Sequence, residues 1–115
     1  NPNRLIINRD LFQGAIRRVS ILSDEKTNSI KLSLRRGELQ VSSNNPEVGE
    51  AKESLSTDYQ NEELDVGFNV RYIQDILSAL QGEEVRILFR DALSPSRLED
   101  PLDPGFVGVI MPMRI

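Results

Sequence analysis

Two segments with helical apolar spacing occupy equivalent places along this 115-residue chain, and they constrain its fold more than any other feature. Apolar residues recur every three or four positions in 9–22 and again in 70–80, which predicts two helices that each bury one face. One predicted strand precedes each helix and three follow it; several of these segments alternate apolar and polar residues, while 4–8 is a short extended run and 106–111 is nearly continuously apolar. The order strand, helix and three strands therefore occurs twice.

Turn-forming residues separate the predicted strands. The strands are expected at 4–8, 30–35, 38–42 and 50–56 in the first half, and at 64–68, 85–89, 96–99 and 106–111 in the second. Arg36-Gly37 predicts a hairpin turn between two of them. The polar strand at 50–56 should lie at a sheet edge or over solvent, and Pro112 should end the last strand or mark an edge.

The helix ends carry their own signals. Asn8 and Asp10 are candidate N-caps of the first helix, Asn69 is a candidate N-cap of the second, and Gly82 fits a C-terminal stop. The predicted buried face of the first helix consists of Leu11, Phe12, Ala15, Ile16, Val19 and Leu22.

These elements predict an α+β fold in a single domain that spans residues 1–115. It would contain a duplicated β-α-β-β-β unit, with two helices packed on antiparallel sheets. Hydrophobic residues make up 38% of the chain and charged residues 28%, which suffices for a core and argues against wholesale disorder. Because the two halves share little residue identity, an ordinary α+β domain whose halves are similar by chance is the alternative.

Composition excludes most enzyme chemistry. The chain has neither Cys nor His, which excludes disulfides, thiolate nucleophiles, Ser-His-Asp catalysis and the usual zinc sites within it. It has no glycine-rich phosphate loop, and we expect neither a cofactor nor a metal. A hydrolase that works with carboxylates alone stays open as an alternative, since paired acids occur at Glu62-Glu63, Glu83-Glu84 and Glu99-Asp100.

No apolar run is long enough for a membrane helix, and the start does not resemble a signal peptide. These two features lead us to expect a soluble cytoplasmic domain. Because the chain begins at Asn1 rather than Met, we expect it to be a piece of something longer.

Charge is unevenly distributed along the chain. The formal net charge is -4, yet residues 47–65 alone hold seven acidic residues and one basic residue. Arg17 and Arg71 each lie on the side of their helix opposite to the apolar face. A solvated helix surface explains this pattern, and a basic helical face near a polyanion is the sharper interpretation.

Apolar residues stand in two unexpected places. Ile21 falls well outside the apolar stripe of its helix, so we expect it to be exposed. An isolated exposed Ile is common, but an interface that covers Ile21 within a charged rim is the alternative. The C-terminal residues 111–115 are mostly apolar, although chain ends are usually polar. These residues either fill the core or line an apolar pocket.

Several of these residues form motifs that resemble a known family. The motifs are Ile21-Leu22-Ser23 followed by Asp24-Glu25-Lys26, Asn44-Asn45-Pro46-Glu47, Gly67-Phe68-Asn69-Val70 followed by Tyr72, and Met111-Pro112-Met113-Arg114. Over essentially its whole length the chain resembles the C-terminal domain of the bacterial DNA polymerase III beta subunit. The combination of the terminal motif with the Gly-Phe-Asn-Val-x-Tyr pattern is specific.

The resemblance implies a DNA-clamp fold and a non-enzymatic role in DNA replication. Proteins of this family are sliding clamps, in which two head-to-tail protomers of three similar domains each form a ring around duplex DNA. The ring is a processivity factor that tethers the replicative polymerase. Arg17 and Arg71 would then face the DNA without reading its bases. No cofactor is implied, because the clamp loader uses the ATP.

The resemblance also implies two protein-binding surfaces. Ile21 and Leu22 would lie in the head-to-tail dimer interface, with a rim of Asp24, Glu25 and Lys26. A pocket would bind short peptide motifs of the polymerase III catalytic subunit, the clamp loader and repair proteins. Its third-domain wall would consist of Thr27, Asn69, Tyr72, Leu93, Pro95, Val109, Ile110, Met111, Pro112, Met113 and Arg114.

The alternative is a stand-alone peptide-binding module that uses the Met-rich terminus and forms no ring. Such a module would need neither a basic helical face nor a second interface at Ile21.

Overall fold

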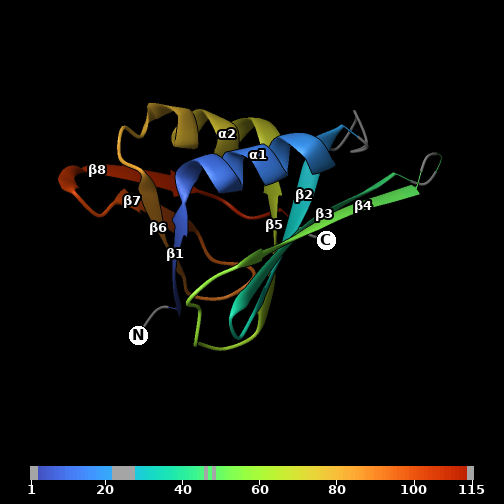
Figure 1. The fold of residues 1–115 in the computed structure, drawn as a ribbon, viewed down its shortest axis with the longest axis horizontal. Coiled ribbons are helices and arrows are strands. Elements are labelled where there is room, and N and C mark those ends of the chain that lie inside the picture. The colour runs from blue at the N-terminus through green and yellow to red at the C-terminus, as the bar shows by residue number, and fades with distance from the viewer. Residues whose placement is uncertain (1–2, 22–27, 46, 48, 114–115) are drawn as a thin grey trace.

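The computed structural model describes residues 3–21, 28–45, 47 and 49–113. Two helices lie side by side on one side of the molecule, and the strands form the other side (Figure 1). The elements are β1 (Asn3–Asn8), α1 (Arg9–Ser20), β2 (Ser29–Arg35), β3 (Glu38–Asn45), β4 (Gly49–Ser56), β5 (Leu64–Asn69), α2 (Val70–Ala79), β6 (Glu84–Phe89), β7 (Ser96–Asp100) and β8 (Asp103–Ile110). This order confirms the predicted twofold repeat of strand, helix and three strands.

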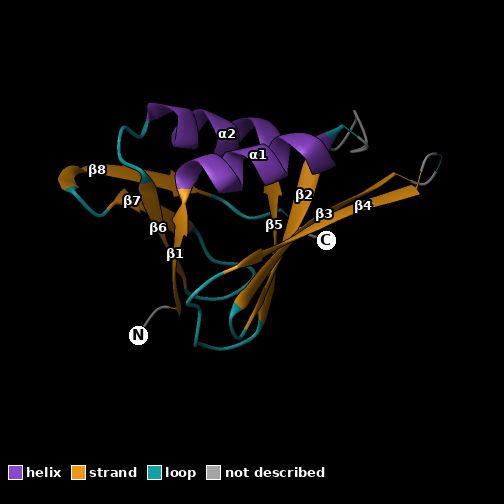
Figure 2. Cartoon of the chain, viewed as in Figure 1, coloured by secondary structure: helices purple, strands orange, loops and turns teal. Residues whose placement is uncertain are grey.

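The strands form two antiparallel sheets, with the orders β1-β6-β7-β8 and β4-β3-β2-β5 (Figure 2). Each half of the chain contributes three strands to its own sheet and its first strand to the sheet of the other half. Thus β1 pairs with β6, and β5 pairs with β2. Because both sheets follow the same rule, the duplication is a property of the topology. The predicted edge position of 50–56 is also confirmed, since β4 is an edge strand.

Asparagine side chains start both helices, as predicted. The Asn8 side chain accepts a hydrogen bond from the Leu11 amide at 2.9 Å, and Asn69 accepts from the amides of Arg71 and Tyr72 at 2.9 and 3.3 Å. The prediction for Gly82 was wrong, because α2 ends at Ala79 with Leu80 as its C-cap. A Cβ atom at Gly82 would lie 2.7 Å from Asp100 Oδ1, so close packing requires this glycine.

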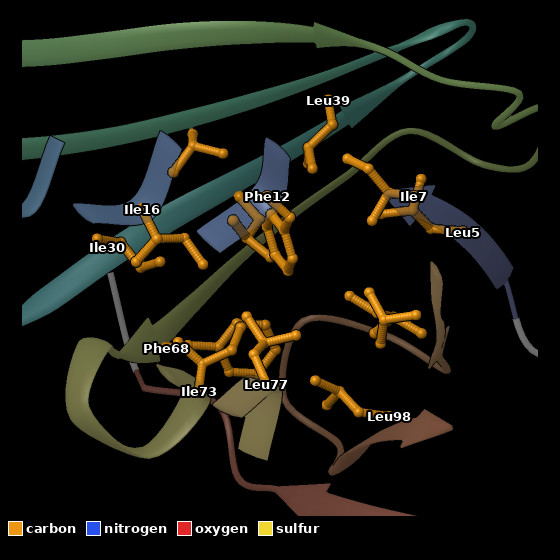
Figure 3. Packing of buried hydrophobic residues seen from close by; sticks show 14 of the residues in the cluster. Leu5, Ile7, Phe12, Ile16, Ile30, Leu39, Phe68, Ile73, Leu77 and Leu98 are labelled. Carbon is orange, nitrogen blue, oxygen red and sulfur yellow. The ribbon is translucent and has the colours of Figure 1, made fainter. Parts of the chain in front are cut away.

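The core lies between the inner faces of the helices and the two sheets (Figure 3). Phe12 and Ile16 of α1 are fully buried, and so are Ile73 and Leu77 of α2. Phe68 of β5 and Phe89 of β6 join the two sheets, with ring centroids 6.4 Å apart. Burial of these large side chains supplies the main driving force for folding.

Leu11 departs from the predicted buried face of α1. Its side chain is 59% exposed, whereas the other described members of that face are fully buried or nearly so. Leu11 lies in the first turn of α1, at the edge of the apolar stripe, where β1 and the end of β4 leave a groove uncovered. Leu22, the sixth predicted member of the face, lies outside the described residues.

Polar contacts fix the two helices in an antiparallel pair. Arg9 of α1 donates a hydrogen bond from Nη1 to the carbonyl of Leu80, just beyond α2. Farther along, Gln13 Nε2 donates to Ser78 Oγ, and Gln74 Nε2 donates to the Gln13 carbonyl, both at 3.3 Å. The start of α1 therefore lies beside the end of α2. Neither helix of the described chain is long and apolar enough to cross a membrane.

The end of the chain connects the two sheets. After β8, the amide of Met113 donates a hydrogen bond to the carbonyl of Gly67 in β5 at 2.8 Å. β8 is the edge of one sheet and β5 is the edge of the other. The tail thus closes the side of the domain where these two edges meet.

We predict that Gly108→Ala destabilises the domain by about 1–3 kcal/mol, the usual cost of overpacking. A Cβ atom at Gly108 in β8 would lie 2.6 Å from Cγ2 of Ile76 in α2, and this methyl group is fixed to a stiff β-branched side chain. The free energy of unfolding from urea titration measures the effect. Gly105→Ala is the control, because Gly105 is exposed in the same strand. Equal stabilities of the two variants would contradict the close packing of α2 on β8.

Candidate functional site

An apolar hollow of about 370 Å³ lies where the first turn of α2 meets the end of β8. We call it the C-terminal hollow. Two of its large side chains, Tyr72 and Met111, are each 62% exposed. The lining residues are Asn69, Tyr72, Val109, Ile110, Met111, Pro112 and Met113. The structure thus brings together seven of the eleven residues predicted for the pocket wall.

Secondary structure determines which side chains the hollow presents. Side chains alternate along β8, so Ile110 is buried in the core while Val109 and Met111 on either side are exposed. The cap at Asn69 fixes the start of α2 and hence the position of Tyr72. The bond between Met113 and Gly67 holds the tail against β5. The hollow is therefore built from the start of α2, the end of β8 and the tail, which contributes Met111, Pro112 and Met113.

The lining suits apolar side chains of a ligand. Two thioethers, a phenol ring and aliphatic groups form an adaptable apolar surface, and the Tyr72 hydroxyl and Asn69 amide are the polar side-chain groups in the described lining. No group of three or more potential metal ligands occurs among the described residues. The hollow can bind a short peptide through apolar contacts, but it offers no acid–base pair for chemistry.

Two described residues that were predicted for the pocket wall, Leu93 and Pro95, are not among the lining residues of the hollow. Thr27 and Arg114 lie outside the described residues. Leu93 is 70% exposed in a loop before β7, where the Asp91 carboxylate accepts hydrogen bonds from the Leu93 and Ser94 amides at 2.8 and 2.7 Å. These hydrogen bonds lower the pKa of Asp91. The loop contains Pro95 and enters β7 at Ser96, which pairs with Ile110, so it lies beside the hollow.

Ile21 follows the last turn of α1 and is 78% exposed, as its helical position predicted. The other residues predicted for the dimer interface and its rim, Leu22, Asp24, Glu25 and Lys26, lie outside the described residues.

Arg17 and Arg71 are both exposed on the helices, and neither side chain makes an ion pair within the described part of the chain. The antiparallel arrangement places both at the same end of the helix pair. Arg18 is different, because its guanidinium binds both carboxylate oxygens of Glu53 in β4, at 2.6 and 2.8 Å. Two of the helical arginines thus remain available to an external polyanion.

The carboxylates of the described residues do not form a catalytic pair. Glu62, Glu63, Glu83 and Glu84 are exposed, and Glu99 binds Arg86 and Arg97 at 2.9 and 3.0 Å. The pKa of Glu53 is lowered by the hydrogen bond from Arg18. A carboxylate hydrolase needs a carboxyl group with a raised pKa, and the two clear shifts, at Glu53 and Asp91, go in the opposite direction. The hydrolase alternative therefore has no support in the site.

Sequence reasoning missed Gly108 and Leu11. Gly108 allows α2 to approach β8, but glycine within an apolar strand gives no sign of which helix lies above it. Leu11 shares the helical spacing of the buried residues, so the pattern alone could not separate it from them.

The fold and the hollow together define a class: a duplicated two-helix, two-sheet domain with an apolar peptide-sized site beside its C-terminus. The family model for the C-terminal domain of the DNA polymerase III beta subunit matches residues 1–114. The chain is 40% identical to the beta sliding clamp of Proteus mirabilis and 39% identical to that of Escherichia coli K12, covering 100% of this chain and 32% of each relative. The chain belongs to the DNA polymerase III beta subunit family.

Solved structures agree with this assignment. The beta sliding clamp of Caulobacter crescentus superposes with a TM-score of 0.95 at 37% identity, over 100% of this chain and 31% of that one. The sliding clamp (DNA polymerase III subunit beta) of Pseudomonas aeruginosa bound to griselimycin superposes with a TM-score of 0.96 at 34% identity, over 100% of this chain and 31% of that one. The DNA-clamp fold is thereby confirmed. The chain spans about a third of the length of the curated relatives it matches.

We predict that Glu53→Gln lowers the urea midpoint of unfolding at pH 7. Because folding lowers the pKa of Glu53, its stabilising effect is fully present above the ordinary value near 4.5 and is lost as the pH falls through the lowered value. The difference in urea midpoint between the natural chain and the variant should therefore fall to zero as the pH is lowered.

The matched control is Glu47→Gln, since Glu47 is an exposed carboxylate without an ion pair among the described residues. If the loss in urea midpoint caused by Glu53→Gln did not depend on pH, or if both variants had the same midpoint at every pH, the contact between Arg18 and Glu53 would not form in solution.

Proposed function

We propose that this chain is the third domain of a ring-shaped sliding clamp, a non-enzymatic processivity factor of DNA replication. Family membership supports the proposal, as does a length that matches about a third of the clamps to which it is similar. Two protomers of the complete protein associate head to tail around duplex DNA in the cytoplasm, and the ring tethers the replicative polymerase.

The C-terminal hollow carries the second part of the proposal. It binds short peptide motifs of the polymerase III catalytic subunit, the clamp loader and other clamp-binding proteins. Exposed Tyr72 and Met111 receive the apolar side chains of the motif, and Ile110 closes the floor. Thr27, Arg114, Leu93 and Pro95 complete this wall of the pocket at its rim, opposite a wall from another part of the protein.

The helix pair supplies the proposed DNA-facing surface. Arg17 and Arg71 attract the phosphate backbone without reading bases, which lets the ring slide. Unlike them, Arg18 is bound to Glu53 and contributes less to this surface. Such diffuse positive charge is enough because the closed ring, rather than tight contacts, holds the DNA.

Ile21 is proposed to anchor the head-to-tail interface, together with Leu22 and a rim of Asp24, Glu25 and Lys26. A β-branched apolar side chain that is 78% exposed at the end of a helix is suited to burial by a partner. A stand-alone peptide-binding module would require neither this residue nor the unpaired arginines, so the ring accounts for more of the observed surface.

We predict that Met111→Ala in the full-length protein raises the Kd for a peptide of the Gln-x-x-Leu-Phe type by about tenfold or more, or about 1.4 kcal/mol. Truncation removes apolar contact area from the hollow while the exposed side chain leaves the core intact. Fluorescence anisotropy of a labelled peptide measures the change. Leu102→Ala, at an 86% exposed leucine outside the hollow, should leave the Kd unchanged, and a similar Kd for both variants would refute the assignment.

We also predict that Ile21→Asp converts the full-length dimer into monomers, because burying a carboxylate without a partner at an interface is strongly unfavourable. Sedimentation velocity measures the change. Leu102→Asp is the control for adding a charge at an exposed leucine. A dimer that persists in Ile21→Asp would exclude Ile21 from the interface.

A further inference from the structure

A second groove lies on the opposite side of the domain, between the free edge of β1 and the end of β4. It has a volume of about 490 Å³. We call it the Leu11 groove, after the exposed leucine in the first turn of α1. Its lining consists of Ile6, Ile7, Asn8, Leu11, Leu55, Ser56, Thr57, Asp58 and Glu84.

The Leu11 groove is the counterpart of the C-terminal hollow in the other half of the repeat. Each is lined by the asparagine that caps a helix and by the third helical residue after it: Asn8 with Leu11 here, Asn69 with Tyr72 there. The end of an edge strand and the segment that follows it contribute to both linings, with residues 55–58 at the end of β4 and residues 109–113 at the end of β8. Ile6, Ile7 and Glu84 line only the Leu11 groove. The duplication has thus produced two depressions of similar construction.

The two depressions differ in what closes them. On the side of the C-terminal hollow, Met113 pairs with Gly67 and joins the two sheet edges. On the side of the Leu11 groove, the segment after β4 contacts the start of β1 through asparagine side chains, since the Arg4 amide donates to Asn61 Oδ1 and the Glu62 amide donates to Asn3 Oδ1. No backbone pairing between β1 and β4 occurs among the described residues. The groove therefore leaves part of the β1 edge accessible.

The accessible edge offers backbone hydrogen bonds. The Arg4 amide points away from β6, since it donates to Asn61 Oδ1 at 3.0 Å. Residues two apart in a strand direct their backbone groups to the same side, so the amide and carbonyl of Ile6 also face away from β6. No partner for them occurs within the described chain, and Ile6 lines the groove. An extended segment can pair there by strand addition.

The charge of the Leu11 groove indicates what kind of ligand it can bind. Asp58 and Glu84 line it and are both exposed, and its lining contains no Lys or Arg. Exposed Leu11 and half-buried Leu55 provide an apolar floor between these carboxylates. We propose that the Leu11 groove binds an extended peptide segment in which apolar side chains alternate with Lys or Arg. Its apolar side chains pack on Leu11 and its cations face Asp58 and Glu84.

The test uses the full-length protein and a fluorescein-labelled peptide, Arg-Leu-Arg-Ile-Arg, with blocked ends. Anisotropy should report saturable binding that weakens with salt, while the matched peptide Glu-Leu-Glu-Ile-Glu should not bind. Leu11→Gln should weaken binding at least tenfold, and so should the double variant Asp58→Asn with Glu84→Gln. Leu102→Gln, which makes the same change at an exposed leucine outside the groove, should bind like the natural protein.

Methyl NMR of the same complex locates the peptide. Shifts at Ile6, Leu11 and Leu55 support the proposal, whereas shifts confined to Val109 and Met111 overturn it. Equal binding by the natural protein and Leu11→Gln also overturns it, since attraction to the overall negative charge then suffices. Binding by the 115-residue chain but not by the full-length protein would show that other parts of the protein cover the groove, and would likewise overturn the proposal. Met111→Ala changes the C-terminal hollow and should leave binding of the Arg-Leu-Arg-Ile-Arg peptide unchanged, so the two sites are tested separately.

Discussion

The exchange of first strands between the two halves is the constraint on which the rest of this structure depends. β1 leaves its own half to pair with β6, and β5 does the same with β2, so neither sheet is complete without the other half. Each helix follows directly after an exchanged strand and is therefore carried to the junction of both sheets. The helices meet there as an antiparallel pair over a common core, to which Phe68 and Phe89 contribute from opposite sheets.

The positions of the proposed binding surfaces follow from this arrangement. With both helices on one side, their outward faces form one surface, and the arginines at 17 and 71 lie at the same end of it. With both sheets on the other side, the edges meet in two places, and each meeting point forms a depression. The tail contributes Met111 and Met113 to the lining of the C-terminal hollow, whereas Asp58 and Glu84 line the Leu11 groove. A symmetric topology thus yields two depressions whose linings differ in chemistry.

Much of the fold could be predicted from the sequence because the apolar periods are strong. Helical spacing, alternating strands and the two asparagine caps define the order of elements, and that order already indicates the repeat. The pairing of the two exchanged strands depends on contacts between residues 30 or more positions apart, such as Leu34 with Leu64 and Leu5 with Ile87, and no local pattern specifies them. The wrong prediction that Gly82 ends α2 has the same cause. This glycine is required by its close contact with Asp100 in β7, which no local pattern specifies.

The candidate site was predictable in part. The terminal motif and the segment from Asn69 to Tyr72 indicated seven residues that the structure brings into one hollow. The loop with Leu93 and Pro95 did not join them, since its course depends on a turn held by the Asp91 side chain. The Leu11 groove was not predictable, because Leu11 has the spacing of a core residue. Its exposure arises only from the gap between two strands of different sheets.

Encirclement of DNA by the complete protein can be tested through the topology of the complex on DNA. The full-length protein, assembled on nicked circular DNA by the clamp loader of its own organism, would be separated from free protein by gel filtration. We expect the protein to stay on the circle at high salt and to be lost when a single cut linearises the same DNA. Equal retention on circular and linear DNA would contradict it, since binding would then rest on contacts with the DNA rather than on a closed ring.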